Sequence, residues 1–274
     1  REAKHRRPET HPLHPAAHSQ QNGYGFRHVP RIYATPPLPV ESTHQSKFSR
    51  QNSPFSGWSF ATTHRMLACM ITNSPLMLSL LVLAAYLLGS IPNGLLIARL
   101  KGVDLQKVGS GNIGATNVFR CVGKGWGVLA FVLDAVKGFV PAFVFPRLLE
   151  SAPPWLGLAC GVAAVAGHNW PVWLKFKGGK GVSTSAGMLL GIAPAAVGIG
   201  FAVFAATVAL TRFVSLGSIL AAIAVPAAYL WMNGADNRLL AGALVLMGLL
   251  VIVKHRANIG RLLKGTEPRI VGKK

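Results

Sequence analysis

Residues 181–211 read GVSTSAGMLLGIAPAAVGIGFAVFAATVALT, a stretch of 31 residues without Asp, Glu, Lys or Arg. A bilayer span needs about 20 predominantly apolar residues, so this stretch is long enough to cross a membrane. As one straight helix it would be about 46 Å long, which exceeds a hydrocarbon core of about 30 Å. Gly191 and Pro194 lie near its middle, where they favour a break. We therefore expect a broken helix or a helical hairpin here.

Three further uncharged stretches accompany this one, at residues 66–98, 151–174 and 213–235. Only 13% of the 274 residues are charged, whereas soluble domains average about 25%. The chain is therefore predicted to be an integral membrane protein. Beside the broken segment, we place spans at residues 75–98, 125–146, 154–173, 213–232 and 238–254.

The basic residues predict how these spans are oriented. The net charge is +20, and beyond residue 65 the positive charges concentrate in the loops 99–124 and 175–180 and in the tail after Val253. Loops rich in Lys and Arg stay on the cytoplasmic side. The second loop and the tail then lie on the same side, so an even number of crossings must separate them. The spans at 213–232 and 238–254 supply two, so the broken segment supplies none or two. We expect an all-α polytopic bundle of about seven transmembrane helices, with the N-terminus outside and the C-terminus cytoplasmic.

Residues 1–65 differ from the rest of the chain. They are rich in His, Pro, Gln, Ser and Arg and show no sustained hydrophobic periodicity, so we expect a disordered N-terminal extension before a membrane domain at 66–274. Met66, Met70 and Met77 precede or open the first span. We hypothesise that the functional protein starts at one of them, which leaves open whether residues 1–65 belong to it.

Composition also bears on partners and cofactors. No basic helix alternates with exposed aromatic residues, so the positive charge does not predict nucleic-acid binding. Cys69, Cys121 and Cys160 lie in or beside apolar runs without paired spacing, which is typical of packing residues. We expect no disulfide, metal or cofactor.

The first polar loop is GSGNIGATNVFR, residues 109–120. Its glycines let backbone amides turn toward an anion, Ser110, Asn112 and Asn117 offer hydrogen-bond donors, and Arg120 offers a guanidinium fork. A capped turn leading into the next helix is an equally good interpretation of this segment alone.

The second polar loop is GHNWPVWLKFKGGKGVST, residues 167–184. Glycines surround Lys180 directly before a helical pattern, and a glycine loop that leads into a helix N-terminus can bind phosphate. It is not a Walker A loop, because Gly181 rather than Ser or Thr follows the lysine. The alternative is that its lysines are only a topology signal.

The third polar segment is KHRANIGRLLKGTEPR, residues 254–269. His255 can act as an acid or a base near neutral pH, and Asn258 follows one helical turn later. Arg256 and Arg261 are long enough to reach a phosphate. A structural histidine at the membrane interface is the alternative.

Together these segments resemble the three cytoplasmic motifs of the PlsY family of bacterial glycerol-3-phosphate acyltransferases. The patterns are SGNxGxxN at 110–117, GHxxPxxxxFxGGKGxxT at 167–184 and HRxNxxRLxxGxE at 255–267, in the family's order. The resemblance implies that the 1-hydroxyl of glycerol 3-phosphate attacks the carbonyl of an acyl phosphate, giving 1-acylglycerol 3-phosphate and phosphate. It further implies the bacterial inner membrane, a cytoplasmic active site, and a soluble enzyme that makes acyl phosphate as a partner.

The resemblance also implies roles for individual residues. We expect catalytic roles for Ser110, Arg120, His255 and Asn258, while Glu267 is expected to be structural. We expect substrate binding from Asn112, Asn117, His168, Gly178, Gly179, Lys180, Gly181, Thr184 and Arg256. His255 and the phosphate of the donor are both candidates for the group that accepts the hydroxyl proton.

Asp134 and Lys137 lie three residues apart within an apolar segment. Charges inside a membrane are costly unless paired or facing a cavity, so we expect an ion pair directed toward the bundle interior. A role near the site and a purely structural role are equally open.

Rival functions are a transporter for a phosphorylated metabolite and another lipid enzyme. Against a transporter, the sequence shows no internal repeat. Against the other lipid enzymes, it lacks the HxxxxD motif of acyl-CoA acyltransferases and the multi-aspartate motif of CDP-alcohol phosphotransferases.

Overall fold

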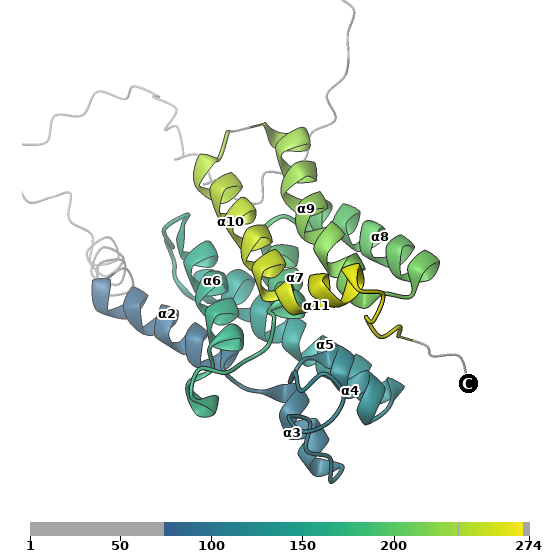
Figure 1. Ribbon diagram of the computed structural model, residues 1–274. Helices are drawn as coiled ribbons and strands as arrows, with labels where there is room; N and C mark the ends of the chain where they lie inside the picture. The colour runs from purple at the N-terminus through teal and green to yellow at the C-terminus, as the bar shows by residue number, and fades with distance from the viewer. Residues whose placement is uncertain (1–73, 235, 271–274) are drawn as a thin grey trace, which may run out of the picture. The chain divides into compact units, whose positions relative to one another are not determined.

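The computed structural model describes residues 74–234 and 236–270, and these residues form helices and loops with no strand among them. The predicted extension 1–65 and the candidate starts Met66 and Met70 lie outside the described residues. The described part of this integral membrane protein is all-α, as its sequence predicts. Figure 1 shows its helices in order.

The first apolar run begins with α2 (Pro75–Gly89) and continues as α3 (Asn93–Leu100). The Oγ of Ser74 accepts a 3.2 Å hydrogen bond from the amide of Met77 and so caps the start of α2. Together α2 and α3 form one run of 26 residues that is apolar and long enough to cross a membrane. The run is interrupted between the two helices, which leaves backbone groups there in need of partners.

The helix α4 (Ala115–Cys121) is short and follows the first polar loop. The long helix α5 (Lys124–Phe139) then continues through a π-helical turn, Val140–Val144, and a 3-10 turn, Phe145–Leu148. The stretch from α5 to Leu148 is again long and apolar enough to be a span.

The uncharged stretch 181–211 is broken, as predicted. It forms α7 (Val182–Ile192) and α8 (Pro194–Thr211), with only Ala193 between them. Pro194 has no amide hydrogen to continue α7, but its fixed φ suits the first position of a new helix. The interruption therefore follows from one residue.

The remaining helices are α6 (Leu156–Asn169), α9 (Val214–Asn233), α10 (Arg238–Lys254) and α11 (Arg256–Leu263). Within the described part of the chain, four helical runs meet the length and hydropathy of a span, and a fifth does if α10 and α11, bent by 56°, count as one. The predicted total of seven crossings and the sides of the termini stay predictions.

Glycines allow the helices α5 and α7 to approach each other closely. At Gly138 on α5 a Cβ atom would collide with the carbonyl oxygen of Thr184 on α7, and at Gly187 on α7 it would collide with the carbonyl oxygen of Ala135 on α5. Small residues that let backbones touch are typical of helix pairs in membranes. The helix α9 lies between α8 and α10 and packs against both (Figure 1).

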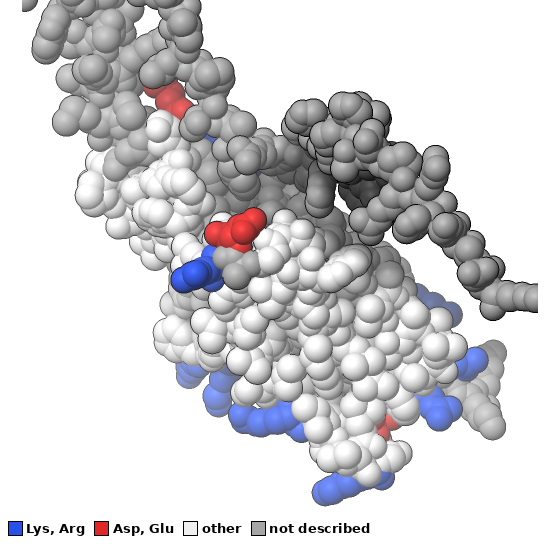
Figure 2. Space-filling view, turned by 90° about the horizontal axis from the view of Figure 1, so that it is seen from above, with Lys and Arg blue, Asp and Glu red and all other residues white. Residues whose placement is uncertain are grey.

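The outer surfaces of α2, α8 and α10 are apolar, with exposed side chains such as Leu83, Phe201 and Leu246. Figure 2 shows a broad uncharged face, with Lys and Arg gathered mainly along its margin. Large exposed apolar faces with charges confined to the margins suit helices surrounded by lipid.

Candidate active site

One cavity of about 230 Å³ brings the three polar segments together. Residues 109–120, the loop before α7 and the segment around α11 all contribute to its wall. Of the residues expected in the site, those that line the cavity are Ser110, Asn112, Asn117, Arg120, His168, Lys180, Gly181, His255 and Asn258. Gly178, Gly179, Thr184 and Arg256 do not line it.

The first polar loop is shaped by its own asparagines. Asn117 is buried, its Oδ1 accepts from the amide of Ser110 at 3.0 Å, and its Nδ2 donates to the carbonyl oxygens of Leu105 and Val108. Asn112 accepts from the amide of Gly114 at 2.9 Å. Both side chains therefore hold the loop in a fixed form at the cavity, with their side-chain oxygens already in use.

Arg120 reaches the cavity from α4. It donates from a terminal nitrogen to the carbonyl oxygen of Pro268 at 2.8 Å, which ties α4 to the C-terminal segment. Its Nε is buried and has no hydrogen-bond partner among the described residues. Burial lowers the pKa of Arg120 below its usual value, although Glu267 opposes this change. A cation with an unused donor is suited to an anionic ligand.

The second polar loop carries the glycines to the start of α7. Gly181 has φ of 77°, a left-handed conformation that glycine adopts readily, and a Cβ there would lie 2.8 Å from Oδ1 of Asn169. The amide of Gly179 donates to the carbonyl oxygen of His168 at 3.0 Å. The first turn of α7 has no side-chain cap, so its backbone amides are available to an anion.

Lys180 projects from this loop into the cavity and donates to Oδ1 of Asn258. Burial lowers its pKa to about 8, the neighbouring Arg261 and Arg120 lower it as well, and Glu267 acts in the opposite direction. Lys180 is thus held beside α11, where the negative charge of Glu267 only partly offsets the effects of burial and of the two arginines.

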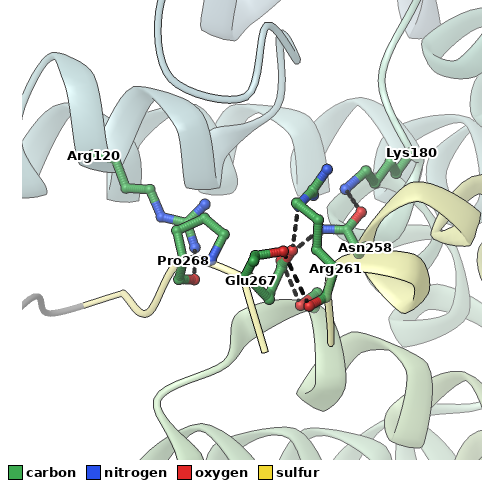
Figure 3. A network of polar contacts seen from close by, with 8 residues as sticks. Arg120, Lys180, Asn258, Arg261, Glu267 and Pro268 are labelled. Carbon is green, nitrogen blue, oxygen red and sulfur yellow. Dashed lines mark hydrogen bonds and ion pairs between the residues drawn. The ribbon is translucent and has the colours of Figure 1, made fainter. Parts of the chain in front are cut away.

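A network around Glu267 fixes the third segment (Figure 3). Its Oε1 accepts from Ser215 Oγ and Asn258 Nδ2, both at 2.7 Å, and its Oε2 pairs with Arg261 Nε at 2.7 Å. Burial alone would raise the pKa of Glu267, but these hydrogen bonds outweigh it and hold the pKa below its usual value. The carboxylate thereby joins α9 and α11 to the C-terminal segment.

His255 lies at the bend between α10 and α11, buried at the cavity wall. Its Nδ1 lies 2.8 Å from the carbonyl oxygen of Val251, which can only accept a hydrogen bond. The proton of a neutral imidazole therefore sits on Nδ1, and Nε2 carries the lone pair.

Asp134 and Lys137 form the expected ion pair. Lys137 Nζ lies 2.9 Å from Asp134 Oδ1, and both side chains are almost completely buried. His168 Nδ1 is 3.8 Å from the same carboxylate oxygen. The pair is thus next to a residue of the cavity wall.

Sequence reasoning did not select several residues of this site. Ser183 and Ser185 on α7, together with Ser215 and Ser218 on α9, line the cavity. Their only signal is a hydroxyl inside an apolar helix. On α11, Arg256 is exposed, whereas Arg261 reaches Glu267.

Beyond its polar end the cavity is apolar. Side chains of α7, α8, α9 and α10 line this part, among them Leu189, Phe201, Phe204, Ala221, Val225, Leu244 and Met247. The lining runs from Ser215 to Pro226 along α9, about 16 Å at the rise of an α-helix. A single site therefore combines cations, helix amides and a long hydrocarbon-like surface.

The family model described as "Glycerol-3-phosphate acyltransferase" matches residues 79–265. A curated protein of that name from Geobacter sulfurreducens is 49% identical over 191 residues, which cover 69% of this chain and 96% of the relative. One from Aquifex aeolicus is 47% identical and covers 69% of this chain and 97% of the relative.

Two solved structures are also similar. Both are of PlsY (YgiH), described as an integral membrane glycerol 3-phosphate acyltransferase. The glycerol 3-phosphate form has a TM-score of 0.66 and 44% identity over 71% of this chain and 96% of that chain. The lysophosphatidic acid form has a TM-score of 0.63 and 43% identity over 70% and 94% of the respective chains.

Proposed function

Because the chain belongs to the glycerol-3-phosphate acyltransferase family, we propose that it transfers an acyl group from acyl phosphate to the 1-hydroxyl of glycerol 3-phosphate. The observation that carries this proposal is the two-part cavity. Its polar end has Arg120, Lys180 and the start of α7, and its other end is apolar along α8, α9 and α10. Such a cavity suits two phosphates and one acyl chain.

The polar end would receive both phosphates. The backbone amides at the start of α7 and the ammonium group of Lys180 are suited to the phosphate of glycerol 3-phosphate, which does not react. The guanidinium of Arg120 is suited to the phosphate of the donor, which gains negative charge as it leaves. Asn112 and Asn117 would act by holding the first loop in place.

In the reaction, the 1-hydroxyl oxygen forms a bond to the carbonyl carbon of the acyl phosphate. The bond from that carbon to the phosphate oxygen breaks, and inorganic phosphate departs with the electron pair. The hydroxyl proton passes to Nε2 of His255, whose lone pair is available at the cavity wall, or to the departing phosphate. An acyl phosphate is already activated, so orientation and charge stabilisation supply the rate without an acyl-enzyme.

We further propose that the polar end faces the cytoplasm of a bacterial inner membrane. The exposed lysines Lys175 and Lys177 precede the glycine loop, and Lys264 and Arg269 follow α11. Positive residues beside spans favour the cytoplasmic side, where glycerol 3-phosphate and a soluble enzyme that makes acyl phosphate would be encountered.

A donor comparison on purified protein tests the proposal. Acyl phosphate, acyl-CoA and acyl carrier protein thioester are each supplied with glycerol 3-phosphate. We expect 1-acylglycerol 3-phosphate, with one inorganic phosphate released per product, from acyl phosphate alone. Product from acyl-CoA but not from acyl phosphate would contradict the donor assignment and leave the acceptor assignment intact.

A further inference from the structure

The ion pair of Asp134 and Lys137 is the most deeply buried charge in the part of the chain that the structure describes, with 1% and 4% of the two residues exposed. Charges inside a membrane protein are costly and mark functional positions more often than structural ones. Well-packed apolar residues often replace such a pair without loss of stability, so stability alone does not account for its presence.

The pair makes its contacts in two directions. Toward the interruption between α2 and α3, Lys137 Nζ donates to the carbonyl oxygen of Ile91 at 2.7 Å, and Asn93 Nδ2 donates to Asp134 Oδ1 at 3.1 Å. These bonds give partners to polar groups at the break between α2 and α3, which is a structural role. Toward the cavity, the same Oδ1 faces Nδ1 of His168 at 3.8 Å.

His168 connects this carboxylate to the glycine loop. Its carbonyl oxygen accepts from the amide of Gly179, and its Nε2 lies so near Gly179 that a Cβ atom there would collide with it. The imidazole also lines the cavity. Its Nδ1 is buried and has no hydrogen-bond partner among residues 74–234 and 236–270. Thus one ring nitrogen faces Asp134 and the other faces the loop.

We propose that Asp134 is a positioning residue, which keeps the proton of His168 on Nδ1 and so presents Nε2 as a hydrogen-bond acceptor for a hydroxyl of glycerol 3-phosphate. A negative carboxylate 3.8 Å from an imidazole nitrogen favours the tautomer with the proton on that nitrogen, because it attracts the N–H dipole and repels a lone pair. Lys137 and Asn93 fix the carboxylate in that position. The inference rests on the proposed function, since it assumes that glycerol 3-phosphate binds at this loop.

The test must separate positioning from charge compensation. Asp134→Asn alone leaves Lys137 buried without its partner and can fail to fold. The informative variant is therefore Asp134→Asn with Lys137→Gln, which is neutral and keeps donors for the backbone at Ile91. With neutral residues at both positions, no negative charge remains beside Nδ1 of His168 to favour a proton on that nitrogen.

Binding of glycerol 3-phosphate is measured by calorimetry on folded, detergent-solubilised protein, together with the KM and kcat of acyl transfer. We expect the double variant to melt near the wild-type temperature while its Kd and KM for glycerol 3-phosphate rise by about tenfold, the equivalent of one good hydrogen bond. The KM for acyl phosphate should change little. When His168→Ala is already present, the same double substitution should change the Kd by less than about twofold.

Wild-type affinity in the double variant would overturn the inference and leave the pair with its structural function alone. A tenfold loss that persists unchanged in the His168→Ala background would also overturn it, because the effect would not pass through that residue. Wild-type protein that does not bind glycerol 3-phosphate would instead contradict the proposed function.

Discussion

Asn258 donates from Nδ2 to Glu267 Oε1 at 2.7 Å. The Oδ1 of the same amide accepts from Lys180, so the asparagine joins the lysine of the glycine loop to the carboxylate of the C-terminal segment. Both ends of the amide are in use. Its expected contribution to activity is therefore best explained by the orientation of Lys180 rather than by direct contact with the attacking hydroxyl.

Glu267→Gln should weaken both the fold and the activity. The substitution removes the charge and replaces the oxygen that accepts from Arg261 with an NH2 group that cannot accept, while the remaining oxygen can still accept from Ser215 and Asn258. Loss of a charged, buried hydrogen bond costs about 2 kcal/mol, so we expect a lower melting temperature and a turnover reduced by about tenfold. Glu150→Gln, at an exposed position, is the matched control. Normal melting and turnover for Glu267→Gln would show that the network does not hold the site.

Binding of glycerol 3-phosphate should weaken as the pH rises past about 8, because the pKa of Lys180 is lowered to about 8 by burial. The charged lysine is the form that attracts phosphate, and the substrate phosphate, with a second pKa near 6, stays doubly ionised throughout this range. We expect the KM for glycerol 3-phosphate to rise between pH 7 and 9. Lys180→Arg, which stays charged, should show a flat profile.

Lys177→Met is the control for this pH dependence, since Lys177 lies in the same loop but is exposed. It should retain the rise in KM. A flat profile in the wild-type protein would remove Lys180 from acceptor binding.

The sequence predicts the fold well where one physical cause dominates. The break at Ala193 follows from Pro194. The prediction of a membrane protein follows from long uncharged stretches, which are suited to lipid rather than to water. The ion pair of Asp134 and Lys137 follows from the cost of charges in lipid. The three polar segments also meet at one cavity, as their motifs imply.

Partners across the chain could not be predicted in this way. The contact of Ser215 with Glu267 joins residues 52 positions apart and depends on the packing of α9 against the C-terminal segment.

Arg261 could have been chosen over Arg256 by helical geometry. It lies three residues after Asn258 and shares its face, whereas Arg256 lies two residues before, about 200° around the helix.

Alanine at Gly179 or Gly181 should raise the KM for glycerol 3-phosphate more than it lowers kcat. At Gly179 the new methyl group would displace the imidazole of His168, and at Gly181 it would press on Asn169 in a left-handed backbone conformation. Either shift moves the amides at the start of α7, and we expect an increase of about tenfold. Gly242→Ala, where a Cβ meets nothing within 4 Å, is the control. Unchanged KM in both loop variants would argue against acceptor binding at this loop.

Filling the apolar end of the cavity should alter the preference for acyl-chain length. Ala221 on α9 lines that end, so Ala221→Phe should raise the KM for long-chain acyl phosphates and spare short ones. Ala209→Phe, on the exposed face of α8 and away from the cavity, should leave the preference unchanged. Equal effects on all chain lengths would place the acyl chain elsewhere.

His255→Ala tests which group accepts the hydroxyl proton. The histidine presents the lone pair of Nε2 at the cavity wall because its Nδ1 donates to Val251, so it is arranged as a base. If it takes the proton, turnover should fall by about a hundredfold or more, the usual contribution of a general base. The KM for glycerol 3-phosphate should change little, because Lys180 and the start of α7 hold the phosphate.

The bend between α10 and α11 makes a folding control necessary, since His255 lies at that bend and its ring bonds to the preceding turn. His255→Gln keeps a side chain able to donate to Val251 but supplies no base. Turnover is therefore compared among wild type, His255→Ala and His255→Gln on monodisperse protein with matched melting temperatures. A similar loss in both variants would assign the base to His255. Near-normal turnover of His255→Gln with loss only in His255→Ala would assign the histidine to support of the bend, and the proton would then pass to the phosphate of the donor.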